Sequence, residues 1–384
     1  MKIAIDNAIL FDGYSTQEPR RIVMENGIII DSTEADTVID GTGCTLLPGL
    51  IESHGHLYDK TKFLKMALQG GINTMMDMGI RKPEQVEELG LRNLPGLPQV
   101  FSSCGLIFAP GSKMYQRMDY PEYMVLKDIH DVPRLVDHQV ELGADYIKLI
   151  FEDEGRNDGV HFPVDVGRAV VERAHGHGKL VVAHCVSNHS YQTALDVGLD
   201  IIAHIPYTEE LTPELAAAVA KQGISVVPTV IMGKNLIAKI ADAHPLVVKI
   251  KRFVNRVKGQ KDAFDFTIKT GIWSLQQLYK ANAMIVAGTD STLEDDKTPA
   301  SVPYGEGLHQ EFELYAEAGI PNLEILQSAT SRAADIWKLH DRGVIAPGKR
   351  ADLILVRGNP VADISCLRNV ERIWIAGKEA SLDT

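Results

Sequence analysis

Residues 47–56 read Leu47-Pro48-Gly49-Leu50-Ile51-Glu52-Ser53-His54-Gly55-His56, an apolar run that ends in two histidines one residue apart. In an extended strand, residues i and i+2 point to the same face. Both imidazoles therefore leave the strand end side by side and can bind one metal ion. Gly55 adds no side chain between them. By itself the pair is a weak signal, so its meaning depends on whether further ligands lie elsewhere in the chain.

The composition sets outer bounds on the class of protein. The chain has 384 residues, 45% of them hydrophobic, and a net charge of −12, which argues against a nucleic-acid partner. Four cysteines lack CxxC spacing, which indicates neither a disulfide framework nor a zinc ribbon and fits a reducing cytosol. The N-terminus shows no signal-peptide pattern, and no apolar run approaches membrane-spanning length. We therefore expect a cytoplasmic protein that does not contact membranes.

The two ends of the chain share a pattern of short strands and turns. Asn26-Gly27 inside the apolar run 22–30 is a strong hairpin signal. Apolar runs at 351–356 and 372–377 continue the pattern near the C-terminus. This predicts a small β-sandwich domain built from both termini, residues 1–46 and 343–384.

The middle, residues 47–342, alternates apolar β-branched runs with helical patterns, which is typical of βαβ units and a parallel sheet. A helix is predicted at Pro213–Gln222, and residues 233–282 are long enough for two or more helices with basic outward faces. Eight strand–helix repeats predict an α/β protein with a (β/α)₈ TIM barrel. The eight strand candidates are 47–56, 72–80, 100–108, 146–151, 180–185, 201–205, 225–232 and 284–290.

Active sites of such barrels form at the C-terminal ends of the strands. Five of the strand candidates carry a histidine, a lysine or an aspartate at or near their C-terminal end. Imidazole and carboxylate groups suit zinc, although manganese, iron, cobalt and nickel also fit. Four histidines, a lysine and an aspartate are therefore expected to converge at one end of the barrel: His54, His56, Lys148, His184, His204 and Asp290.

These motifs resemble the amidohydrolase superfamily of metal-dependent hydrolases across essentially the whole chain. The resemblance rests on the opening at 48–56 and on the closing motif Ala346-Pro347-Gly348-Lys349-Arg350-Ala351-Asp352-Leu353. The segments 143–148 and 309–334 are most similar to imidazolonepropionase-like and Xaa-Pro dipeptidase-like members.

The resemblance implies two divalent metal ions, with zinc expected. His54 and His56 would bind the inner ion with Asp290. His184 and His204 would bind the second ion, and Lys148, carboxylated by carbon dioxide, would bridge the two. A free ammonium between two cations is unfavourable, whereas a carbamate is an anionic bidentate ligand. Asp290 would also act as the catalytic general base.

The function expected is a binuclear amidohydrolase that cleaves an amide-type C–N bond of a dipeptide or N-acyl amino acid by metal-bound hydroxide. Deaminase or cyclic amide hydrolase activity on a nitrogen heterocycle is one alternative. Superfamily deaminases place a glutamate a few residues after the fifth- or sixth-strand histidine, and none follows His184 or His204 that closely. Lactone, carbamate or ester hydrolysis stays open. A non-catalytic binding protein would typically have lost ligands, and all are retained here.

Candidate contacts to a small-molecule substrate lie in the loops after the strands. Tyr207, Arg117 and Arg156 are candidates for binding a carboxylate or carbonyl oxygen, and His309 for lying near the substrate. Two alternatives are equally open: the arginines are solvated surface charges, and His309 is structural. The second His-x-His, at 175–177, falls at a predicted helix C-terminus, so we expect it to be structural. A homo-oligomer is left open.

Overall fold

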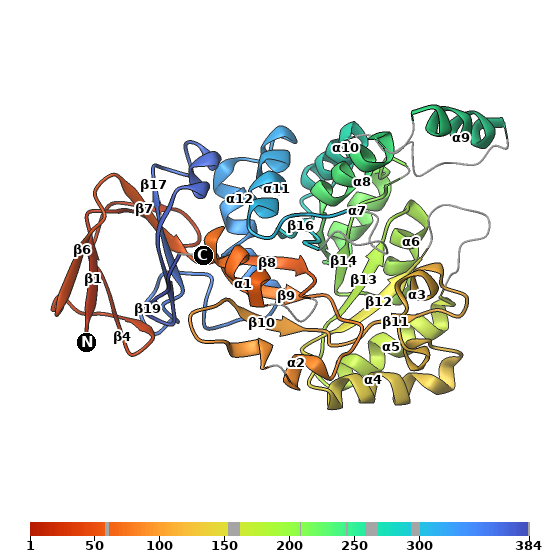
Figure 1. Cartoon of the computed structure of the whole chain (residues 1–384), viewed down its shortest axis with the longest axis horizontal. Coiled ribbons are helices and arrows are strands. Elements are labelled where there is room, and N and C mark those ends of the chain that lie inside the picture. Colours follow the sequence, from red (N-terminus) through yellow and green to blue (C-terminus); the bar gives the residue numbers. More distant parts are fainter. Residues whose placement is uncertain are drawn as a thin grey trace.

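The structure is a computed structural model, and it describes residues 1–57, 61–88, 90–152, 162–207, 209–242, 245–257, 268–292 and 300–382. Figure 1 shows a β-rich part at one end and a larger part of strands and helices beside it. No helix among these residues is both long and apolar enough to cross a membrane.

The larger part contains two parallel sheets. The first has the order β10-β9-β8, and the second has the order β11-β12-β13-β14-β15-β16. Their strands are β8 (Leu50–Gly55), β9 (Ile72–Asp77), β10 (Gln99–Ser102), β11 (Ile107–Phe108), β12 (Ile147–Phe151), β13 (Val181–Cys185), β14 (Ile201–Ala203), β15 (Ser225–Val227) and β16 (Met284–Ile285).

Backbone hydrogen bonds join the two sheets at both edges. On one side, Ser53 N donates to Ala287 O at 3.0 Å and His56 N donates to Ser291 O at 2.9 Å. On the other, Asp145 N donates to Ser102 O at 2.8 Å. The fold is therefore α/β of the TIM-barrel type, as expected.

Helices cover the outside of these strands, and local sequence signals set their ends. Ser187 and Ser190 form a capping box at the start of α6, and α7 matches the predicted helix from Pro213 to Gln222. The helices are α1 (Thr61–Gln69), α2 (Gln85–Glu88), α3 (Lys113–Met118), α4 (Val132–Glu141), α5 (Val164–Gly176), α6 (Asn188–Val197), α7 (Pro213–Gln222), α8 (Val230–Asp242), α9 (Pro245–Val257), α10 (Ile268–Lys280), α11 (Glu306–Glu317), α12 (Asn322–Ser328) and α13 (Ser331–Ile336).

The β-rich part joins the two ends of the chain. One sheet has the order β5-β4-β1-β6, and the other has the order β19-β18-β17-β7-β2-β3, in which β17 pairs antiparallel with β7. Their strands are β1 (Ile3–Asp6), β2 (Ile9–Phe11), β3 (Thr16–Gln17), β4 (Ile22–Glu25), β5 (Ile28–Ile30), β6 (Thr37–Asp40), β7 (Cys44–Pro48), β17 (Leu353–Arg357), β18 (Val370–Ile375) and β19 (Lys378–Glu379). The predicted Asn26-Gly27 hairpin is confirmed, with φ values of 50° and 87° in the β4–β5 turn. The exact domain boundaries stay a prediction.

Several strand predictions were wrong in extent. The candidate 100–108 is two strands, β10 and β11, and the candidates 72–80, 201–205 and 284–290 end at Asp77, Ala203 and Ile285. The run 47–56 is two strands, β7 and β8, because the chain leaves the terminal sheet at Gly49. A Cβ atom there would lie 2.1 Å from the Asn73 side chain. The candidate 225–232 ends at Val227, because Val230 already begins α8. Short apolar runs do not distinguish a buried helix start from a strand.

Candidate metal centre

Three predicted ligands meet where β8 ends. The His54 Nε2 atom lies 3.5 Å from Asp290 Oδ1, and the His56 Nε2 atom lies 3.1 Å from the same oxygen. One ligand atom from each of these residues falls within 4.8 Å of the others. Asp290 reaches this position because its amide N donates to His54 O at 2.8 Å and its backbone has φ of 62°. The geometry can hold a metal ion.

Two further histidines extend the cluster towards the neighbouring strands. The His204 ring centroid lies 4.8 Å from that of His54 and 4.4 Å from that of His184. His184 belongs to β13, and His204 directly follows β14 with φ of 76°. The structure therefore brings the predicted ligands of both ions together at one end of the sheets.

Lys148 points into the same region from β12. Its side chain is 2% exposed, and its Nζ atom has no hydrogen-bond partner within the described part of the chain. Burial lowers the pKa of this amine to about 8, against a smaller opposing effect of Asp290. Burial lowers the pKa values of His54 and His204 well below their usual range, and the nearby charge of Lys148 lowers them further.

This arrangement fits the implied metal ions. An isolated buried amine is costly, because no partner replaces its hydration. The His54 Nδ1 atom is a second buried polar atom that lacks a partner among the residues described. Imidazoles, one carboxylate and a lysine that gains an anionic group on carboxylation together form a donor set for divalent cations.

Neighbouring groups orient two of the imidazoles. The His56 Nδ1 atom lies 3.1 Å from Gly79 O, which can only accept, so Nδ1 carries the proton and Nε2 faces Asp290. The His204 Nδ1 atom lies 2.8 Å from the Thr229 hydroxyl. Burial alone would lower the pKa of His56, but the Asp290 carboxylate raises it above its usual value.

Buried acids hold the backbone segments around the cluster by accepting their N–H groups. The sequence patterns did not predict these acids. The Glu52 carboxylate accepts from His54 N at 3.0 Å and from Thr289 N at 2.9 Å, and burial raises its pKa to about 8. Asp77 accepts from Leu57 N at 3.0 Å. Glu52 could have been found, because it shares the i, i+2 face of β8 with His54.

A third buried acid, Glu311, contacts the start of a neighbouring helix and not a predicted metal ligand. Glu311 on α11 accepts from Val230 N at 2.9 Å and from Ile231 N at 2.7 Å, so it caps the start of α8. Thr229 directly precedes α8, and its backbone has φ of 49°. Its hydroxyl is the group that contacts His204 Nδ1. No local sequence signal marks Glu311 or Thr229.

Of the four candidate substrate contacts, the structure places Tyr207 next to the cluster. The Tyr207 hydroxyl lies 3.2 Å from His204 Nδ1, next to the cluster. Arg156 lies outside the described residues, and so does the side chain of Arg117. His309 is buried on α11, where its charged neighbours are Arg368, Glu306 and Glu313. Its proximity to substrate stays a prediction.

The second His-x-His lies at the C-terminal end of α5, as expected. His175 Nε2 lies 2.9 Å from Asp200 Oδ2, and His177 Nε2 lies 2.8 Å from Asp137 Oδ1. Each imidazole therefore has its own carboxylate partner at the helix end.

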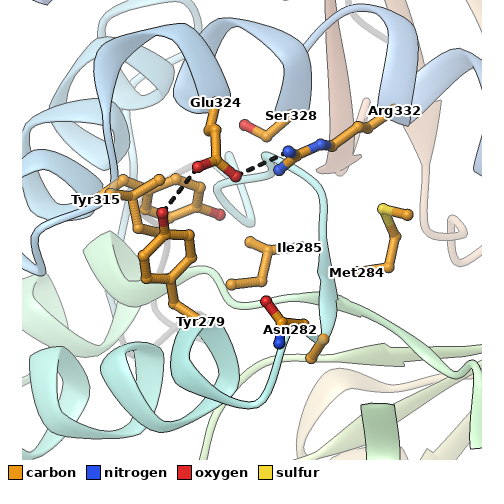
Figure 2. A pocket seen from close by; sticks show the side chains of 10 residues that line it. Tyr279, Asn282, Met284, Ile285, Tyr315, Glu324, Ser328 and Arg332 are labelled. Atoms are coloured by element: carbon orange, nitrogen blue, oxygen red, sulfur yellow. Dashed lines mark hydrogen bonds and ion pairs between the residues drawn. The ribbon is translucent and has the colours of Figure 1, made fainter. Parts of the chain in front are cut away.

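A cavity of about 150 Å³ lies at the opposite end of β16 from Asp290. Figure 2 shows Glu324 between Tyr279 and Arg332 in its wall. The Tyr279 hydroxyl donates to Glu324 Oε1 at 2.7 Å, and Arg332 Nη2 donates to Glu324 Oε2 at 2.8 Å. Both oxygens of this carboxylate are already bound. The cavity begins at the N-terminal end of the strand, so it is separate from the metal centre.

The chain is similar in sequence or fold to several known proteins. An uncharacterized protein of Mycobacterium bovis is 27% identical over 55% of this chain and 57% of its own length, so the chain spans little more than half of that relative. A 5'-deoxyadenosine deaminase of Methanothermobacter thermautotrophicus is 22% identical over 84% of this chain and 76% of its own. The crystal structure of a Xaa-Pro dipeptidase with bound methionine superposes with a TM-score of 0.80 at 23% identity, covering 99% of this chain and all of the other.

The sequence profile of the Amidohydrolase family matches residues 45–380. This range contains the predicted metal ligands, nearly all of β7 and the C-terminal strand β17 that pairs with it. The chain belongs to the amidohydrolase family.

Proposed function

We propose that this protein is a binuclear metal-dependent amidohydrolase that cleaves the amide bond of a dipeptide or an N-acyl amino acid. The observation that carries the proposal is the buried Lys148 amine, which has no hydrogen-bond partner among the described residues and interacts electrostatically with His54, His204 and Asp290. A lysine in that position is unfavourable next to cations unless it is carboxylated. In this proposal the metal is zinc and the protein is cytoplasmic, which the four free cysteines support.

His54, His56 and Asp290 would hold one ion, and His184 with His204 the other, while carboxylated Lys148 would contact both. When bound, two such ions lower the pKa of a shared water molecule and polarise a carbonyl group. The Asp290 carboxylate would accept the proton from that water and return it to the leaving amine. The first transfer uses the carboxylate as acceptor and the second uses the carboxylic acid that it has become, so both need Asp290 close to the reacting atoms.

Tyr207 would supply the donor for the oxygen of the substrate carbonyl. Burial raises the pKa of its phenol far above the usual range, so the hydroxyl stays protonated at neutral pH. A neutral donor held beside His204 can stabilise charge that develops on that oxygen. We retain Arg117 and Arg156 as candidates for the substrate carboxylate.

The fold similarity to a Xaa-Pro dipeptidase supports the choice of substrate class. Deamination of a nitrogen heterocycle is the second candidate, because the 5'-deoxyadenosine deaminase match covers most of the chain. The nearest acid after His204 is Glu209, and its carboxylate accepts from Asn188 N at 2.9 Å. This engagement, together with its distance along the chain from His204, disfavours a proton shuttle there.

The proposal also includes closure of the two parallel sheets into one (β/α)₈ barrel and stacking of the terminal sheets as a β-sandwich. The inter-sheet hydrogen bonds of Ser53, His56 and Asp145 support the closure. The apolar cluster that joins Ile5, Leu10 and Trp374 supports the sandwich.

A library of dipeptides and N-acyl amino acids tests the proposal, with zinc-loaded protein and detection of released amine. The Asp290→Asn variant serves as the matched control for contaminating hydrolases. We expect turnover of at least one member by the wild type and none by the variant. Ammonia release from purine nucleosides without any amide hydrolysis would instead identify a deaminase.

A further inference from the structure

Helix α9 carries a row of exposed apolar side chains. Leu246, Ile250, Phe253 and Val257 are 71%, 55%, 69% and 71% exposed. Their spacing of three and four residues places them on one face of the helix. Soluble monomers rarely expose a contiguous apolar surface of this kind without a partner. This row, which we call the α9 face, is therefore a surface that no described residue of the chain covers.

The charges of α9 are as one-sided as its apolar residues. Lys249, Lys251, Arg252 and Arg256 are all basic, and the helix has no acidic residue. The whole chain has a net charge of −12, so the rest of the molecule is strongly acidic. Figure 1 shows α9 at the outer edge of the α/β part, beyond α8 and α10. A second molecule can approach it from that side.

We propose that the α9 face docks on a second copy of this chain. Burial of Phe253 and its apolar neighbours would supply the main favourable free energy, because large aromatic side chains dominate such contacts. The exposed Lys249 and Arg256 would form the rim and face the acidic surface of the other copy. An anionic membrane would attract the same helix but would repel the acidic body behind it.

Sedimentation velocity of the full chain between about 1 and 100 μM tests the proposal. We expect reversible self-association by the wild type and a dissociation constant at least tenfold higher for the Ile250→Ser/Phe253→Ser variant. The matched control is Val38→Ser, which replaces a 52% exposed apolar residue on β6 and should leave the association unchanged. Circular dichroism checks that every variant is folded.

A second variant isolates the charge argument. Lys249→Glu/Arg256→Glu keeps the α9 face and should also weaken the association, because it reverses the charges at the rim. The proposal is overturned if the wild type stays monomeric, or if the Ile250→Ser/Phe253→Ser variant associates as tightly as the wild type. Co-sedimentation with phosphatidylglycerol vesicles by a protein that does not self-associate would assign the α9 face to lipid and overturn it as well.

Discussion

The Nδ1 atom of His204 lies 2.8 Å from the hydroxyl oxygen of Thr229, and both residues have a positive φ. Non-glycine residues in this region are uncommon, and they persist where the surrounding structure holds them. Here the capping of α8 by Glu311 holds Thr229, and Thr229 in turn orients the imidazole of His204. The predicted second metal site therefore depends on groups that do not touch the metal.

Replacement of Thr229 tests this dependence. Thr229→Val keeps the branched shape at an unfavourable φ but removes the hydroxyl, so we expect zinc affinity to fall about 10- to 100-fold. Competition with a fluorescent chelator measures the affinity. Thr229→Ser, which keeps the hydroxyl, should retain most of it. Equal affinity of the Val variant and the wild type would mean that the contact does not position His204.

Removal of the Lys148 amine should empty one of the two metal positions. The Lys148→Ala variant should lose most second-site metal, because no other anionic group of the described cluster can replace a carbamate there, and activity should fall with it. Elemental analysis of wild type and variant purified in parallel measures the content. Unaltered metal content in the variant would refute the bridging role.

Asp290→Asn should preserve the fold and remove turnover. Asparagine is nearly isosteric but cannot accept the proton, and general acid–base groups contribute about 10²- to 10⁴-fold to rate. Steady-state kinetics on the best substrate of the library give the ratio, and thermal unfolding checks the fold. Substantial hydrolysis by the variant would show that another group is the base.

His177→Ala should leave metal content unchanged, because this imidazole pairs with Asp137 at the end of α5. A partly exposed ion pair contributes at most about 1 kcal/mol, so stability should barely change. Metal loss in this variant would show that the wrong His-x-His pair was assigned to the centre.

The buried Glu52 predicts a pH dependence of stability in chelator-treated protein. Its pKa is about 8 in the folded state because of burial, against an ordinary value of 4.5. Between these two values the unfolded state loses the proton while the folded state keeps it, so the free energy of unfolding falls as pH rises.

Glu52→Gln removes the titrating group and can keep the hydrogen bonds to His54 N and Thr289 N. Its free energy of unfolding should therefore fall less between pH 5 and pH 8, by of order 2–4 kcal/mol. Urea unfolding at the two pH values provides the comparison. Parallel pH profiles would show that Glu52 ionises normally in the fold.

The parts of the site that could be predicted are those with a local periodicity. His54 and His56 follow from the alternation of a strand, and His204 and Asp290 follow from their positions after apolar runs. The supporting groups could not be found in this way. Thr229 lies 25 residues from His204 along the chain, and Glu311 lies 81 residues from Val230. Only the fold brings them together.

The fold shows the same division between local and long-range information. The Asn26-Gly27 turn and the helix at Pro213–Gln222 depend on adjacent residues and were predicted correctly. Val230, Ile231 and Met232 were wrongly assigned to a strand, because their helical start depends on the carboxylate of Glu311. A cap supplied from another helix leaves no trace in the neighbouring sequence.

Elemental analysis of the wild-type protein, purified without chelators in buffer that contains bicarbonate, tests the central claim most directly. The geometry of His54, His56, Lys148, His184, His204 and Asp290 predicts about two divalent ions per chain, as in other two-metal sites. Protein that holds no metal after such a purification, and takes up none from added zinc, would contradict the account.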